Sequence, residues 1–283
     1  MPHPYEICFL ATAIHRPYEE FLIPFALFAL HSHPRGFVEM IVEDRMAFAK
    51  HYADQLRALE ATTDRFGLRE FSRPRNHHIP NTFRFFEQPI TKATYTYVMD
   101  VDVMLLEDIV PWFTSHFPTP EKVVNNIIRK NSMHLTGMHF VRSEVYFTPR
   151  LHALQEKYYH QRPDAQGDIL TSDERVLYHI VDEYGALPPL DYQQRRIHGI
   201  HFSPNRGPGQ KMNLATSAGY RDKFIAVLDA YPEFKSFANV QRLWDMLSAE
   251  FRIRGEAAFF AQRPGADLWS LWQARVSTCK NSP

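Results

Sequence analysis

Two aspartates, Asp100 and Asp102, are the strongest candidates in this chain for functional residues. They directly follow residues 94–99, a β-branched and aromatic run with high strand propensity. Two carboxylates at this spacing point to the same side of an extended chain, and open α/β sheets bind ligands at the carboxyl ends of their strands. A surface turn at a strand end would have the same composition. A buried pair must be hydrogen-bonded or hold a hard cation such as Mg²⁺ or Mn²⁺.

The flanks of this pair carry a family resemblance. Residues 97–109, from Tyr97 through both aspartates to the acidic-apolar Asp108-Ile109, resemble the DxD region of GT-A glycosyltransferases, family 8 in particular. The resemblance implies that Asp100 and Asp102 bind Mn²⁺ (or Mg²⁺), and that Asp100 also contacts the bridged diphosphate of a nucleotide-sugar. It covers about residues 5–212 through short motifs in the family's order.

Two later segments resemble the donor-sugar pocket of that family. Gly137 matches the glycine of an Asn-Ala-Gly strand, although Leu135 and Thr136 replace its first two residues. Asp173 and Glu174 resemble the start of an Asp-Gln-Asp helix beneath the sugar, which implies that they are catalytic residues. Two structural interpretations remain beside these. Gly137 could simply allow a close backbone approach, and Glu174 could complete a capping box whose N-cap is Thr171.

A third segment, residues 196–211, resembles the family's closing loop. The resemblance implies that His201, which precedes Phe202, is the third metal ligand, with His198 as the alternative. A neutral imidazole suits such a site. The family's Lys-Pro-Trp is absent, so Arg206 or Lys211 would have to contact the diphosphate.

Near the N-terminus the resemblance implies further donor contacts. Ala11 and Thr12, small residues at the end of the first strand, would leave room for the nucleoside. Tyr18 would stack on the base, and Asp44 and Arg84 would lie near the donor.

The elements that position these residues follow from hydrophobic periodicity. Strands are predicted at residues 7–13, 37–43, 94–99 and 138–141, helices at 18–30, 49–59 and 176–184, and a loop at 69–89. Their alternation predicts an α/β fold with a mainly parallel sheet. The resemblance implies a GT-A-type, Rossmann-like mixed sheet flanked by helices. We expect a catalytic domain at residues 1–212 and a C-terminal helical extension at 213–283.

Composition narrows the function classes. The 283 residues contain 32 Lys and Arg against 32 Asp and Glu, so the chain lacks the basic surplus typical of nucleic-acid-binding proteins. Its two cysteines exclude a disulfide scaffold. The longest apolar run, residues 21–30, is half of the ~20 residues that span a bilayer. We therefore expect a cytoplasmic protein without a transmembrane segment.

Residues 221–262 mix apolar and cationic side chains at helical spacing, which could mean a peripheral membrane contact. Acidic residues dilute the basic face, however, so we expect this segment to pack on its own domain or on a second subunit in a homodimer.

The function favoured by the sequence is metal-dependent glycosyl transfer. The resemblance implies a hexosyltransferase of polysaccharide biosynthesis, using a UDP-sugar donor and a saccharide, glycan or glycolipid acceptor with retention of configuration. A metal-dependent phosphoesterase and a non-catalytic nucleotide-sugar-binding module remain as alternatives. The chain has no dinucleotide-binding, P-loop or α/β-hydrolase glycine motif.

Overall fold

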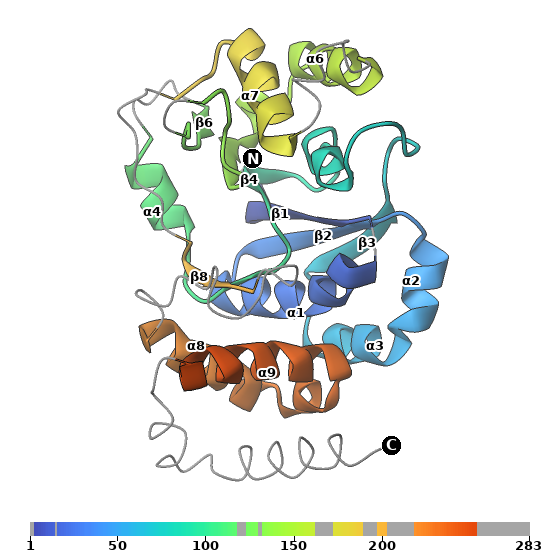
Figure 1. Ribbon diagram of the computed structural model, residues 1–283, viewed down its shortest axis with the longest axis vertical. Helices are drawn as coiled ribbons and strands as arrows, with labels where there is room; N and C mark the ends of the chain where they lie inside the picture. The colour runs from blue at the N-terminus through green and yellow to red at the C-terminus, as the bar shows by residue number, and fades with distance from the viewer. Residues whose placement is uncertain are drawn as a thin grey trace.

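The computed structural model describes residues 3–14, 16–117, 123–129, 132–161, 172–188, 197–202 and 218–253. At its centre is a six-stranded sheet with the strand order β3-β2-β1-β4-β7-β6 (Figure 1). The first four strands in this order are parallel to one another, and β7 pairs antiparallel with both of its neighbours, β4 and β6. Their bounds are β1 Tyr5–Ala13, β2 Gly36–Val42, β3 Phe66–Glu70, β4 Ala93–Met99, β6 Val124–Asn125 and β7 His139–Arg142.

Strand β1 is the middle of the core because both of its faces are covered. Ile7, Phe9 and Ala11 pack into one hydrophobic cluster, while Cys8 and Leu10 pack into the other. This alternation follows from the two-residue period of a strand. A parallel strand covered on both faces reads as a continuous apolar run, which is why the sequence indicated it clearly.

Helices cover both faces of the sheet. In the view of Figure 1, α6 and α7 lie above the sheet and α1 lies below it, with α8 and α9 beneath α1. The helix bounds are α1 Arg16–Ser32, α2 Arg45–His51, α3 Ala53–Thr62, α4 Val110–Ser115, α5 Ser143–Tyr146, α6 Pro149–His160, α7 Asp173–Tyr184, α8 Ala218–Ala230 and α9 Ala238–Ile253, with 3₁₀ turns η1 Pro80–Phe85 and η3 Pro232–Ser236. The predicted α/β class is confirmed, and the mixed sheet with flanking helices is consistent with a GT-A-type, Rossmann-like fold.

The described C-terminal helices belong to the same core as the sheet. Phe224 of α8 stacks on Phe28 of α1 with ring centroids 4.7 Å apart. Asn239 of α9 donates to the carbonyl oxygen of Glu20 at 2.7 Å. This part of the extension therefore packs on its own domain. Among the described helices, none has both the length and the apolar composition needed to cross a membrane.

Three predicted boundaries were wrong. Residues 69–89 are not all loop, since β3 continues to Glu70 and η1 begins at Pro80. The helix predicted at 49–59 is two helices, α2 and α3, separated at Tyr52. Helix α7 has Ser172 rather than Thr171 as its N-cap, without a side-chain cap bond, and Thr171 lies outside the described residues. The sequence of β3 shows no hydrophobic periodicity, because all of its residues are half-buried or exposed.

Candidate active site

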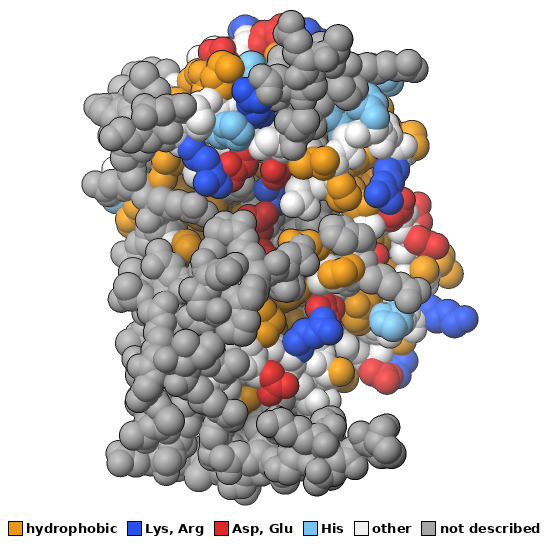
Figure 2. Space-filling model, in the orientation of Figure 1, with side chains coloured by type: hydrophobic (Ala, Val, Ile, Leu, Met, Phe, Trp, Pro, Cys, Tyr) orange, Lys and Arg blue, Asp and Glu red, His pale blue; other side chains and the backbone are white. Residues whose placement is uncertain are grey.

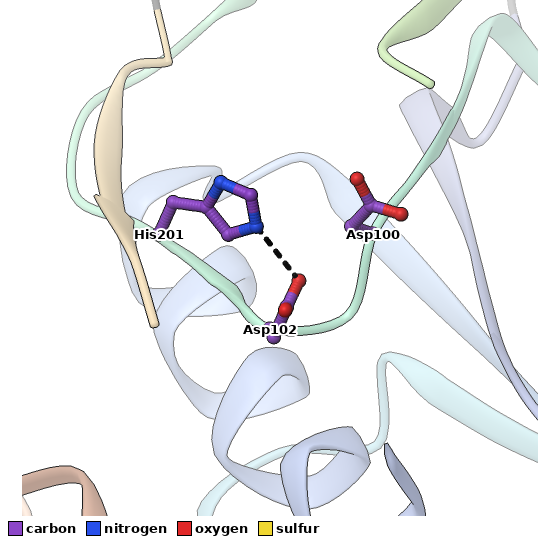
Figure 3. A group of neighbouring side chains, drawn as sticks. All are labelled: Asp100, Asp102 and His201. Atoms are coloured by element: carbon purple, nitrogen blue, oxygen red, sulfur yellow. Dashed lines mark ion pairs between the residues drawn. The ribbon is translucent and has the colours of Figure 1, made fainter. Parts of the chain in front are cut away.

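Asp100, Asp102 and His201 lie together just beyond the carboxyl end of β4. One ligand atom from each residue lies within 4.8 Å of the others, and Figure 3 shows His201 reaching Asp102 from a neighbouring strand. His201 Nε2 is 3.3 Å from Asp102 Oδ1. That oxygen is buried and accepts no hydrogen bond from the described residues. A buried carboxylate oxygen without a hydrogen bond from the described residues, beside a second carboxylate and an imidazole, fits a divalent cation such as Mn²⁺ or Mg²⁺.

A two-stranded ribbon brings His201 to the aspartates. Strand β5 (Val103–Leu105) starts directly after Asp102 and pairs antiparallel with β8 (Gly199–His201), which places His201 opposite Val103. The Phe202 amide also donates to the Asp102 carbonyl oxygen at 2.8 Å. A Cβ at Gly199 would lie 1.9 Å from the Met104 carbonyl oxygen, so only glycine permits this approach.

His198, the alternative ligand, belongs to the support of the ribbon. It has a left-handed backbone, with φ of 59°. Its buried side chain places Nδ1 2.8 Å from Glu107 Oε1. The geometry therefore groups His201, and not His198, with the two aspartates.

Arg84 bridges two of the predicted site carboxylates. It projects from η1, its guanidinium is buried, Nη1 pairs with Asp100, and Nη2 donates to Asp173 Oδ2 at 2.7 Å. Burial alone would lower the pKa of Arg84, but the carboxylates of Asp100 and Asp173 raise it. Burial raises the pKa of Asp173, and Arg84 opposes that rise. The result is a fixed carboxylate–guanidinium–carboxylate row.

Gly137 leaves the space that this row occupies. A Cβ at Gly137 would lie 2.6 Å from Arg84 Nη2 and 3.4 Å from Asp100 Oδ2. The segment is held by Asn126, whose side-chain oxygen accepts from the Thr136 hydroxyl at 2.6 Å. Gly137 therefore lies at the site. The absence of a side chain at this position allows the close approach of the Arg84 guanidinium.

Glu174 pairs with Arg129, which lies 45 residues before it in the chain. Arg129 follows the short antiparallel bridge between Ile128 and Leu135. Hydrogen bonding to Glu174 raises the pKa of Arg129, although burial opposes this. No sequence pattern pointed to Arg129, because its distance from Glu174 along the chain is closed only by the fold.

Thr12 and Tyr18 line a pocket with Arg84 and Asp100. Ile14 connects it with a second cavity of about 240 Å³ at the carboxyl ends of β1, β2 and β3. Both pockets lie at the carboxyl ends of strands of the sheet.

Of the other predicted donor contacts near the N-terminus, Ala11 and Asp44 do not line the first pocket. Ala11 is fully buried in the core. Asp44 caps α2, accepting a hydrogen bond from the Ala47 amide at 2.8 Å. Arg206 and Lys211 lie outside the described residues. On the face drawn in Figure 2, described acidic and basic side chains are intermixed, without an extended patch of one sign.

No protein-family model and no curated protein matches this chain. Among solved structures, it is similar to the glycosyltransferase GlyE of Streptococcus pneumoniae TIGR4, at 9% identity and a TM-score of 0.46 over 62% of this chain. It spans only 43% of the GlyE chain. The galactosyltransferase LgtC with donor and acceptor sugar analogues has 14% identity and a TM-score of 0.41, with 61% and 69% of the two chains covered. The mannosyltransferase PcManGT of Pyrobaculum calidifontis, with GDP-Man and Mn²⁺, has 13% identity and a TM-score of 0.40, with 97% and 86% covered. These neighbours are glycosyltransferases, and the function proposed below rests on the side chains of the site.

Proposed function

We propose that this protein is a metal-dependent glycosyltransferase that moves a hexosyl group from a nucleotide-sugar to an acceptor hydroxyl. The observation that carries the proposal is the Asp100, Asp102 and His201 group beside the Arg84–Asp173 pair. A cation site alone would suit many reactions. Its position at the carboxyl end of the sheet, beside a pocket lined by Thr12 and Tyr18, is where open α/β sheets bind their ligands.

Asp100, Asp102 and His201 would hold the cation, Mn²⁺ or Mg²⁺. When bound, it would neutralise the charge that develops on the departing diphosphate. Arg84 fixes the Asp100 carboxylate from the side, so this ligand is already oriented before a donor binds. Arg206 or Lys211 is proposed to add positive charge for the diphosphate, as the resemblance implies.

Asp173 and Glu174 are the proposed acidic residues of the sugar subsite. The Arg84 guanidinium holds Asp173, and Arg129 holds Glu174, so both carboxylates have fixed directions. Asp173 is also mostly buried, with a side chain 16% exposed. A carboxylate held in this way can stabilise an oxocarbenium-like centre. The resemblance supports retention of configuration.

The donor base and ribose are proposed to lie in these two neighbouring pockets. Thr12 and Tyr18 line the pocket next to Asp100, and the second cavity continues from Ile14 along the ends of β2 and β3. The resemblance favours a UDP-sugar as the donor. It also favours a saccharide, glycan or glycolipid as the acceptor.

The test is a panel of UDP-, GDP- and CDP-sugars, with and without Mn²⁺. Thermal shift measures binding, and release of nucleoside diphosphate measures turnover with candidate acceptors. We expect metal-dependent stabilisation and nucleoside diphosphate release. Inorganic phosphate release would instead indicate a phosphoesterase. Stabilisation without turnover would indicate a binding module.

Asp102→Asn tests the metal group, and Asp108→Asn is its matched control. Asp108 lies in the same motif, but it is not one of the three grouped residues. We expect Asp102→Asn to abolish the Mn²⁺-dependent donor binding and turnover while the protein stays folded. Full Mn²⁺-dependent activity in this variant would overturn the assignment.

A further inference from the structure

Glu107 connects three segments that lie far apart in the sequence. Its Oε1 lies 2.8 Å from His198 Nδ1 and accepts a hydrogen bond from the Tyr220 hydroxyl at 2.8 Å. Its Oε2 accepts from Lys223 Nζ at 3.3 Å. His198 begins the turn into β8, whereas Tyr220 and Lys223 belong to α8. One carboxylate thus holds the end of the β5 segment, the entry to β8 and the first C-terminal helix.

The ribbon that carries His201 needs such support. Strands β5 and β8 have three residues each and form a separate two-stranded sheet. A two-stranded ribbon is only marginally stable by itself. His198 also has a left-handed backbone, which is costly for a residue other than glycine. A fixed side chain at His198 offsets that cost and keeps the turn in place.

The main-chain bonds show how a shift at His198 would reach the metal group. The Leu106 amide donates to the His198 carbonyl oxygen at 3.0 Å, at the Glu107 end of the ribbon. The Phe202 amide donates to the Asp102 carbonyl oxygen at the other end. His201 lies between these two bonds, so its place beside Asp102 depends on the register that both of them maintain.

We infer that Glu107 is a positioning residue that ties α8 and the His198 turn to the ribbon carrying His201. The C-terminal helical layer is therefore part of the support of the metal site. A contact with Lys223 alone would contribute little, because an exposed ion pair is screened by solvent. The hydrogen bonds to the buried His198 and to Tyr220 are the stronger part of the connection.

The test compares Glu107→Gln with Glu20→Gln. Glu20 is the matched control because its carboxylate is similarly accessible, 17% against 20%, and also joins the C-terminal layer, through Arg242, without touching the ribbon. Amide hydrogen exchange is measured for residues 103–106 and 199–202. We expect exchange there to become about tenfold faster in Glu107→Gln, and to stay unchanged in Glu20→Gln.

The metal readout rests on the proposed function and is measured separately, by calorimetric titration with Mn²⁺ alone. We expect the Kd of Glu107→Gln to rise about tenfold, which is the lower end of the range for direct partners of metal ligands, because Glu107 supports His201 only through the ribbon. Suppose that ribbon exchange is faster in Glu107→Gln but the wild-type protein binds no Mn²⁺. This result would support the positioning role and overturn the proposed function. Unchanged ribbon exchange in Glu107→Gln would overturn the positioning role.

Tyr220→Phe tests the link to α8 with a smaller change, and it also serves if Glu107→Gln does not fold. It removes one hydroxyl from Glu107 and leaves His198 in place. We expect ribbon exchange to become faster, by less than in Glu107→Gln. Exchange equal to the wild type would overturn the part of the inference that includes the C-terminal layer.

Discussion

Replacing Gly137 with alanine would place one methyl group against the guanidinium that joins Asp100 to Asp173. The added Cβ would lie 2.6 Å from Arg84 Nη2, whereas ordinary contact begins near 3.4 Å. Relief therefore requires a displacement of about 0.8 Å, the difference between these distances. The end of an exposed arginine could make this movement freely. The Arg84 side chain is only 6% exposed, and its Nη2 is bonded to Asp173 Oδ2 at 2.7 Å.

The cost follows from that bond. A displacement of 0.8 Å directed away from Asp173 would lengthen the bond to the limit for a hydrogen bond. A hydrogen bond to a charged group contributes about 1.5–3 kcal/mol, so we expect Gly137→Ala to lower the free energy of unfolding by about 2 kcal/mol. If the displaced Arg84 also leaves Asp100 misplaced, the same energy corresponds to about 30-fold weaker metal-dependent donor binding.

Urea unfolding and titration with a nucleotide-sugar in the presence of Mn²⁺ measure the two effects. Gly67→Ala is the control, because its new Cβ would meet only the Phe37 ring, at 3.6 and 3.7 Å. We expect Gly67→Ala to change stability much less and donor binding not at all. A Gly137→Ala protein as stable as Gly67→Ala, with unchanged donor binding, would refute the role given to the Arg84 bridge.

Four further variants test separate parts of the structure. His201→Ala should weaken Mn²⁺ binding at least tenfold with little loss of stability, whereas His198→Ala should mainly destabilise the fold. Calorimetry measures the binding and urea unfolding measures the stability. The reverse pattern would show that the ribbon register is wrong. Burial lowers the pKa of His139 to about 3, while the unfolded chain takes up this proton near pH 6.5. The free energy of unfolding should therefore fall as the pH drops from about 6.5 towards 3. Between pH 7 and 5, urea unfolding should show that the wild type loses about 2 kcal/mol more of this free energy than His139→Gln does. Asp44→Ala should cost about 1 kcal/mol by removing the α2 cap, and a parallel rise in the donor Kd would indicate that Asp44 also contacts the donor.

The sequence by itself determined most of the sheet and its covering helices. Strands β1 and β2 are mostly apolar and buried, β4 is a β-branched and aromatic run, and α7 has an apolar stripe, so local pattern and burial agree. The aspartate pair was predictable for the same reason, because it directly follows a strand that the sequence marks clearly. The weaker elements escaped: β3 is half-buried, and η1 is a short 3₁₀ turn that has no amphipathic period.

Only the tertiary structure decided which other side chains join the aspartates. His198 and His201 occur in one short segment, and the sequence left both open as ligands. The antiparallel register of β5 and β8 places His201 beside Asp102 and turns His198 towards Glu107. The Arg84 bridge likewise requires η1, the end of β4 and the start of α7 to meet. Such contacts between distant segments depend on packing and strand register, which local sequence patterns do not encode.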